Sequence, residues 1–230
     1  MYLIIIFMNL IFAFRNQKRY KRDFADFILK KYKKATKAAF LPFLISTLAF
    51  YLAWFLGSAT VPYLGYIPIG HTQITFLAFI VVFGTFHLDY VGNLSAGLCF
   101  GFSSWILAFI MGAIKYQNFD IAVIPRVLMA ICVYMLYEIF NVKNNIKCWK
   151  FIMISIIAAI LNIVLTLSFQ HLHNQIFGDL KNLLPIKEWI IVHPINIIGE
   201  PIICGMLAYF TFPLIVFLRR RFEQRFRYYW

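Results

Sequence analysis

Residues 151–169 read FIMISIIAAILNIVLTLSF, nineteen positions without a charged side chain. A helix of about 20 apolar residues is what crosses the hydrocarbon core of a bilayer. The rest of the chain has the same character, because 62% of its residues are hydrophobic and only 13% are charged. That composition is too apolar for a soluble domain, whose surface must be wetted by charged groups. The sequence therefore predicts an integral membrane protein.

Further apolar segments predict the rest of a membrane bundle. The expected spans are residues 38–56, 67–86, 91–112, 121–140, 151–169 and 195–218. The second is short and weak, because the Pro and Gly in its opening Ile-Pro-Ile-Gly-His (67–71) interrupt a helix, and we expect a turn there at the membrane surface. A chain of 230 residues has room for these spans and short loops. The sequence thus predicts an all-α integral membrane protein with six transmembrane helices.

The distribution of Lys and Arg predicts how the bundle is oriented, because cytoplasmic connections are enriched in these residues. With the N-terminus inside, 18 of the 22 Lys and Arg residues fall on the cytoplasmic side and three on the outer side. We therefore expect both termini in the cytoplasm and the chain in the cell membrane. The net charge of +13 is concentrated at the ends of spans, which favours contact with anionic lipid and argues against nucleic acid as a partner.

The two ends of the chain differ from the expected membrane domain, residues 35–221. Residues 1–34 begin with an apolar stretch too short to cross a bilayer, which either lies in the interface or precedes the true start of the protein. A basic stretch follows, with apolar positions at helical spacing. This pattern predicts an amphipathic helix on the cytoplasmic leaflet, and a solvated helix is the alternative. Residues 222–230 form a basic, aromatic tail.

Polar groups gather in the outer halves of three spans, where ionisable side chains are costly and therefore functional candidates. Arg126 lies about one turn below the outer end of the fourth span, and Glu200 lies at a similar depth in the sixth, after Asn196. Asn162 lies in mid-membrane in the fifth span. The convergence of these four predicts a cavity that opens outward and binds a small polar ligand. The alternative is a structural ion pair between Arg126 and Glu200.

Two outer connections are candidate lids for this cavity. Residues 57–71, GSATVPYLGYIPIGH, carry no charge and are rich in Gly, Pro and Tyr. Such a loop offers aromatic faces and backbone groups to a ligand, and we select Tyr66 and His71 as its ligand contacts. An ordinary linker is the alternative. Residues 170–194 are long for a connection and predict a short helix on the membrane surface.

The sequence shows no catalytic, metal or nucleotide-binding constellation. His171 and His173 are two positions apart, which is not a helical ligand spacing, and no acidic or thiol partner accompanies them. The cysteines are scattered without a CxxC pair. No nucleophile has a visible base, and no GxxxxGK[ST] loop is present. We therefore expect no catalytic residue, metal site or cofactor in this chain, and any ATP and Mg²⁺ would act in partner subunits.

Gly97 and Gly101 have GxxxG spacing in the third span, and Ser104 and Ala108 continue the same face. Small residues at this spacing let a neighbouring helix approach closely. We interpret the stretch as a packing surface.

The order of several short motifs resembles the substrate-binding S components of energy-coupling factor (ECF) vitamin transporters. The resemblance covers about residues 33–221. It is carried by Ile67-Pro68, Gly84, Tyr90-Val91-Gly92, Gly97-x-x-Phe100-Gly101-x-Ser103-Ser104, Ile124-Pro125-Arg126, Asn162 and residues 196–200.

The resemblance implies six helices and an outward vitamin site lined by Arg126, Asn162, Asn196 and Glu200. It also implies that the chain binds a vitamin outside and docks on a module of one transmembrane coupling protein (the T component) and two ATPases. It would then tip over in the membrane to release the vitamin inside.

The resemblance further implies a docking surface of alanines in AxxxA spacing on the first span. Ala35 and Ala39 match that position, and Ala49 and Ala53 repeat the spacing deeper in the span.

The Phe-Gly-x-Ser-Ser stretch and the Pro-Arg step look most like the pantothenate-type branch of the family. A guanidinium such as that of Arg126 suits a carboxylate. Two other classes compete with this interpretation. A self-sufficient secondary transporter predicts an internal repeat or an ion-coupling chain of acids, and a membrane-embedded enzyme predicts a nucleophile beside a base. We find neither pattern in the sequence.

Overall fold

A computed structural model describes residues 40–58, 60–61, 63–69, 72–178 and 185–226. The chain divides into two units, one made of residues 1–45 and 224–230 and the other of residues 46–223. Several predictions fall outside the described residues: the extension 1–34, the end of the tail, Ala35, Ala39 and His71.

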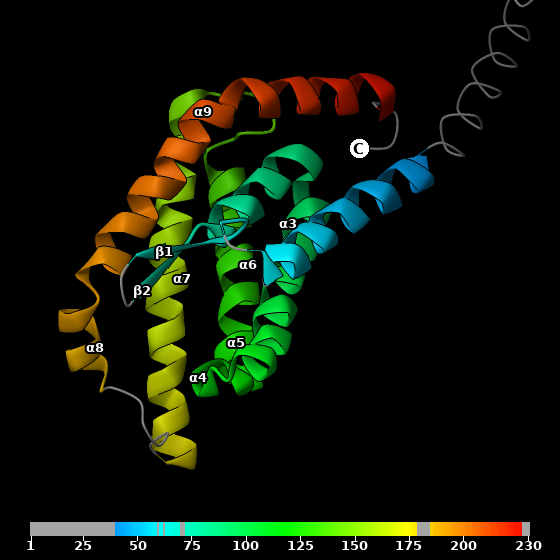
Figure 1. Ribbon diagram of the computed structural model, residues 1–230. Coiled ribbons are helices and arrows are strands. Elements are labelled where there is room, and N and C mark those ends of the chain that lie inside the picture. The colour runs from blue at the N-terminus through cyan, green and yellow to red at the C-terminus, as the bar shows by residue number, and fades with distance from the viewer. Residues whose placement is uncertain (1–39, 59, 62, 70–71, 179–184, 227–230) are drawn as a thin grey trace, which may run out of the picture. The chain divides into compact units, whose positions relative to one another are not determined.

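The described chain is mostly helical, and five of its helices are long and apolar enough to cross a membrane (Figure 1). These are Phe40–Ser58, Leu77–Ile110, Phe119–Ile139, Cys148–Phe177 and Pro194–Gln224. The labelled helices are α3 (Leu77–Met111), α4 (Ile114–Gln117), α5 (Phe119–Ala122), α6 (Ile124–Ile139), α7 (Cys148–Phe177), α8 (Ile186–Val192) and α9 (Pro194–Phe226). Five apolar helices agree with the expectation of a multi-pass, helical membrane protein.

Helix α3 contains residues 77–86 of the second expected span and nearly all of the third, and it is sharply broken between them. Leu88 and Asp89 have non-helical backbone angles, and Asp89 has a φ of 58°. The two parts of α3 then approach so closely that a Cβ on Gly92 would collide with the carbonyl of Gly84. Glycine removes that clash. The break falls in the connection expected at residues 87–90, but the part before it is only about 16 Å long, so six spans remain a prediction.

The expectation of an all-α fold is wrong for residues 66–75, which form a β-hairpin. Strand β1 (Tyr66–Ile69) pairs antiparallel with β2 (Thr72–Thr75), with Tyr66 opposite Thr75. Residues 67–69 of the predicted turn therefore lie in β1, the other two lie outside the described residues, and α3 begins only at Leu77. The physical reason is the density of β-branched residues in this stretch, which favour strands over helices.

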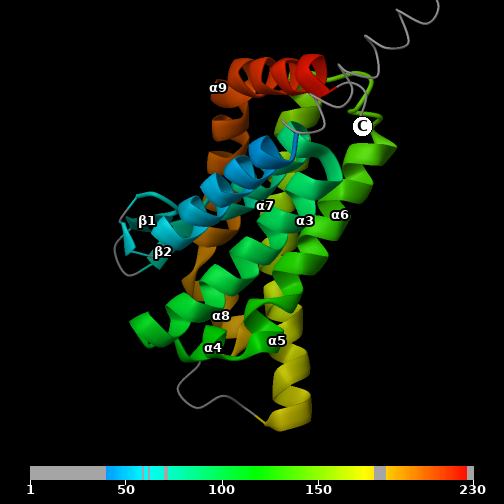
Figure 2. The ribbon, with the colours of Figure 1, turned by 90° about the vertical axis from the view of Figure 1, so that its right-hand side faces the viewer.

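Gly97 and Gly101 lie on the face of α3 that packs against α6, which runs beside it (Figure 2). A Cβ on Gly97 would meet the side chain of Ala130, and one on Gly101 would meet Val123. The two glycines therefore allow the close approach of α3 and α6. The carbonyl of Arg126 also lies near Gly97, so this packing fixes the start of α6 relative to α3.

Candidate functional site

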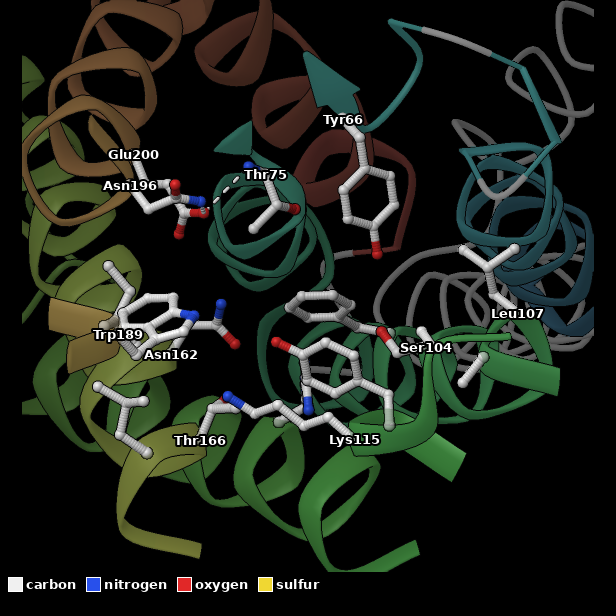
Figure 3. Close-up of a pocket in the computed structure, with 17 residues that line it drawn as sticks. Tyr66, Thr75, Ser104, Leu107, Lys115, Asn162, Thr166, Trp189, Asn196 and Glu200 are labelled. Carbon is white, nitrogen blue, oxygen red and sulfur yellow. Dashed lines mark hydrogen bonds between the residues drawn. The ribbon is translucent and has the colours of Figure 1, made fainter. Parts of the chain in front are cut away.

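A cavity of about 400 Å³ lies between the hairpin and helices α3, α4, α6, α7, α8 and α9 (Figure 3). Its volume is in the range of pockets that hold small organic ligands. Five of the six residues selected from the sequence as ligand contacts line it: Tyr66, Arg126, Asn162, Asn196 and Glu200. These five side chains come from four separate parts of the chain, and the fold brings them together around one space.

Arg126 is held at the start of α6 by the end of the preceding helix. Its Nη1 donates hydrogen bonds to the carbonyl oxygens of Ile121 (2.6 Å) and Ala122 (2.9 Å), which belong to α5. The guanidinium lies 4.8 Å from the ring centre of Tyr116 and 5.5 Å from that of Phe100. The side chain is 5% exposed, and its Nε has no hydrogen-bond partner in the described structure. Arg126 is thus rigidly placed with unused hydrogen-bonding capacity.

Glu200 connects α9 to the hairpin. Its Oε1 accepts hydrogen bonds from the backbone N–H of Thr75 (3.1 Å) and from Nδ2 of Asn196 (3.4 Å). Because Oε1 takes both bonds, Oε2 is the oxygen available to a ligand. Glu200 is 4% exposed, so its carboxylate is held in place inside the protein.

Arg126 and Glu200 do not form a direct ion pair in the structure, so the alternative interpretation of these two residues is wrong. The ion pairs found among the described residues join other side chains. Each of the two groups is instead positioned by backbone atoms, on different elements. The charges therefore face the same cavity without cancelling each other in a contact.

Lys115 is a second cation in the cavity that the sequence analysis did not select. It belongs to α4, is 8% exposed, and its Nζ lies 5.4 Å from the ring centres of both Tyr116 and Trp189. Burial alone would raise the pKa of the Tyr116 phenol, but the charges of Lys115 and Arg126 lower that pKa below its ordinary value of 10.0. Positive charge therefore dominates this side of the cavity.

Asn162 and Thr166 face the cavity from one side of α7, a single turn apart. Each is 5% exposed. Oδ1 of Asn162 and Oγ1 of Thr166 are buried and have no hydrogen-bond partner in the part of the chain that the structure describes. A buried polar atom without a partner costs about 1–3 kcal/mol, and such atoms in a cavity are suited to binding a polar ligand.

Other residues in the lining were also missed from the sequence, among them Thr75, Phe100, Ser104 and Trp189. One signal for Trp189 was available, because it lies within the expected lid 170–194. For Lys115 the signal was its isolation, since it is the one charged residue in residues 112–118. The helix α4 has only four residues and is too short to show a hydropathy pattern, so the sequence does not indicate that Lys115 is buried.

The remaining predicted residues lie away from the cavity. Ala49 and Ala53 are exposed on the helix Phe40–Ser58. His173 bonds through Nδ1 to Asp120 (2.8 Å), and His171 bonds to Gln175 (3.0 Å). Among the residues that the structure describes, no group of three or more His, Cys, Asp or Glu side chains is arranged to hold a metal ion.

Comparison with known proteins adds no assignment. No protein-family model matches the chain, and a search of curated proteins finds no match. The cavity is therefore the main indication of function.

Proposed function

We propose that the chain is the membrane-embedded, substrate-binding subunit of an ECF-type transporter and captures a small vitamin outside the cell. The observation that carries the proposal is the cavity of about 400 Å³, in which buried polar groups from separate helices face one space. Rigidly held polar groups in a mostly apolar pocket are the usual construction of a small-molecule site. The motifs quoted above support the same function.

The proposal includes six spans, with both termini in the cytoplasm and the break in α3 as the connection between the second and third. The charge distribution supports this orientation. In Figures 1 and 2, α4, α5 and α8 lie toward one end of the unit. Lys143 and Arg219 are both bound to Asp89, at the break of α3. The end that carries α4, α5 and α8 would face outward, and the end that carries Asp89 and its two partners would face the cytoplasm.

Uptake itself would require partners. The chain would dock on a T component and two ATPases, and Ala35, Ala39, Ala49 and Ala53 are the proposed contact surface. ATP and Mg²⁺ would act in the ATPases. Pantothenate is our best candidate for the substrate, because it carries a carboxylate for Arg126 and hydroxyl groups that can donate to Glu200.

The proposal is tested by thermal unfolding of the purified protein in the presence of a panel of B vitamins. A ligand at 100 times its dissociation constant stabilises the folded state by about 2.7 kcal/mol, so a true substrate should raise the Tm clearly. Arg126→Gln should abolish this shift. Arg220→Gln, which changes an exposed arginine outside the cavity, is the matched control and should retain it. A panel in which no vitamin raises the Tm contradicts the proposal.

A further inference from the structure

The two cations of the cavity are unusual because neither has an anionic partner. Lys115 is 8% exposed and Arg126 is 5% exposed. No ion pair between either side chain and an Asp or Glu occurs in the described part of the chain. A buried charge without a counter-charge is strongly unfavourable unless something else compensates it. Two carbonyl oxygens compensate part of that cost for Arg126, and the aromatic faces of Tyr116 and Trp189 compensate part of it for Lys115.

A second buried lysine, Lys150, has the hydrogen bonds that are typical of a cation with a structural role. Lys150 is 6% exposed, much like Lys115. Its Nζ donates hydrogen bonds to the carbonyl oxygens of Phe140 (2.7 Å) and Asn145 (2.9 Å). Among the described residues, none accepts a comparable hydrogen bond from the Nζ of Lys115. The Nζ of Lys115 instead lies near the aromatic rings of Tyr116 and Trp189. Lys115 therefore faces the cavity with its hydrogen bonds unused.

The cavity has a different character on its opposite side. We call Lys115, Arg126 and Tyr116 the cationic side, and Glu200, Asn196 and Thr75 the acceptor side. In Figure 3, Glu200, Asn196 and Thr75 lie together across the open space from Lys115. Oε2 of Glu200 accepts hydrogen bonds and can donate none while the carboxylate is ionised. A ligand that spans the cavity should therefore carry a negative charge at the end near the cationic side and hydrogen-bond donors at the end near the acceptor side.

We propose that the ligand of this cavity is a small organic acid whose acidic group binds between Lys115 and Arg126 and whose other end donates hydrogen bonds to Glu200. Lys115 is then the residue that selects acids over their neutral analogues. This inference rests on the proposed function and narrows it to one class of substrate. It depends on the charges that line the cavity and not on which vitamin fits it.

The first test compares acids with their neutral analogues on the purified protein. The probes are pantothenate with panthenol, biotin with biotinamide, nicotinate with nicotinamide, and thiamine as a cation. We expect one of the acids to raise the Tm and its neutral analogue to bind at least about 10-fold more weakly, as expected when a charged hydrogen bond is lost. Equal binding of a neutral or cationic probe overturns the inference and leaves the proposed function standing. Binding of no probe overturns both.

The second test compares the thermal stability of the empty protein between variants, together with their affinity for the acid. Lys115→Met removes an unpaired buried cation, so the empty protein should keep or gain thermal stability while it loses its affinity for the acid. Lys150→Met, the matched control, breaks two hydrogen bonds to carbonyls and should lower the Tm. Lys115→Arg keeps the charge and should retain part of the binding. A fall in Tm for Lys115→Met as large as that for Lys150→Met would show a structural role for Lys115 and overturn the inference.

Discussion

At the scale of single residues, the protein buries charge in two ways. Lys150 donates to two carbonyl oxygens and Arg219 pairs with Asp89. Arg126 also donates to two carbonyl oxygens, but neither it nor Lys115 forms an ion pair among the described residues. We propose that this difference separates side chains that stabilise the fold from those that bind a ligand. It also explains why an ionisable residue in a membrane span is only a candidate until its partners are known.

If the cavity binds an acid as proposed, we expect Tyr116 to make that binding sensitive to alkaline pH. Lys115 and Arg126 lower its pKa, so the phenol is neutral at low pH and forms a phenolate as pH rises through that lowered value. The phenolate would compete with the acidic group of the ligand, so affinity should fall. Tyr116→Phe cannot ionise and should move this loss to higher pH. Calorimetric titration with the stabilising acid between about pH 7 and about pH 10 measures both profiles, and coincident profiles would contradict the idea.

At the scale of elements, the break in α3 is stabilised by a charged group in an unfavourable backbone conformation. Asp89, with a φ of 58°, is 1% exposed, and its Oδ2 lies 3.3 Å from Nζ of Lys143 and 3.6 Å from Nη2 of Arg219. These contacts join α3 to the α6–α7 connection and to α9. Glycine would fit the backbone better, so the carboxylate is the reason for an aspartate here.

The two ion pairs of Asp89 should differ greatly in strength. The side chain of Arg219 is 4% exposed, while that of Lys143 is 47% exposed. Asp89→Asn leaves a buried guanidinium with Glu223 as its remaining ion-pair partner among the described residues and should cost about 3 kcal/mol of stability. Lys143→Met removes a solvated pair and should cost less than about 1 kcal/mol. Thermal unfolding in detergent compares the two variants, and equal losses would refute this ranking.

At the scale of the whole molecule, the sequence predicted what depends on local composition. Apolar runs identified the long helices, and isolated polar residues within them identified Arg126, Asn162, Asn196 and Glu200. The hairpin was missed because part of what holds it is distant, since Glu200 bonds to Thr75 from 125 positions away. Lys115 was missed because its burial depends on how α4 packs, which no hydropathy average reports.

The proposed orientation can be tested by labelling single cysteines with a membrane-impermeant maleimide in intact cells. The background would lack the four native cysteines, Cys99, Cys132, Cys148 and Cys204. Ile176 is exposed at the C-terminal end of α7, so Ile176→Cys should be labelled from outside. Lys143→Cys should be labelled only after the membrane is permeabilised. The reverse pattern would invert the bundle and direct the cavity toward the cytoplasm.

An experimental structure of the protein with the acid that stabilises it most would test directly whether the cavity binds a small organic acid. We expect density for that acid inside the cavity, with the carboxylate of the acid at Lys115 and Arg126 and the donor groups of the acid at Glu200. Density for the ligand at another place, or these three side chains closed against protein atoms with no space between them, would contradict it.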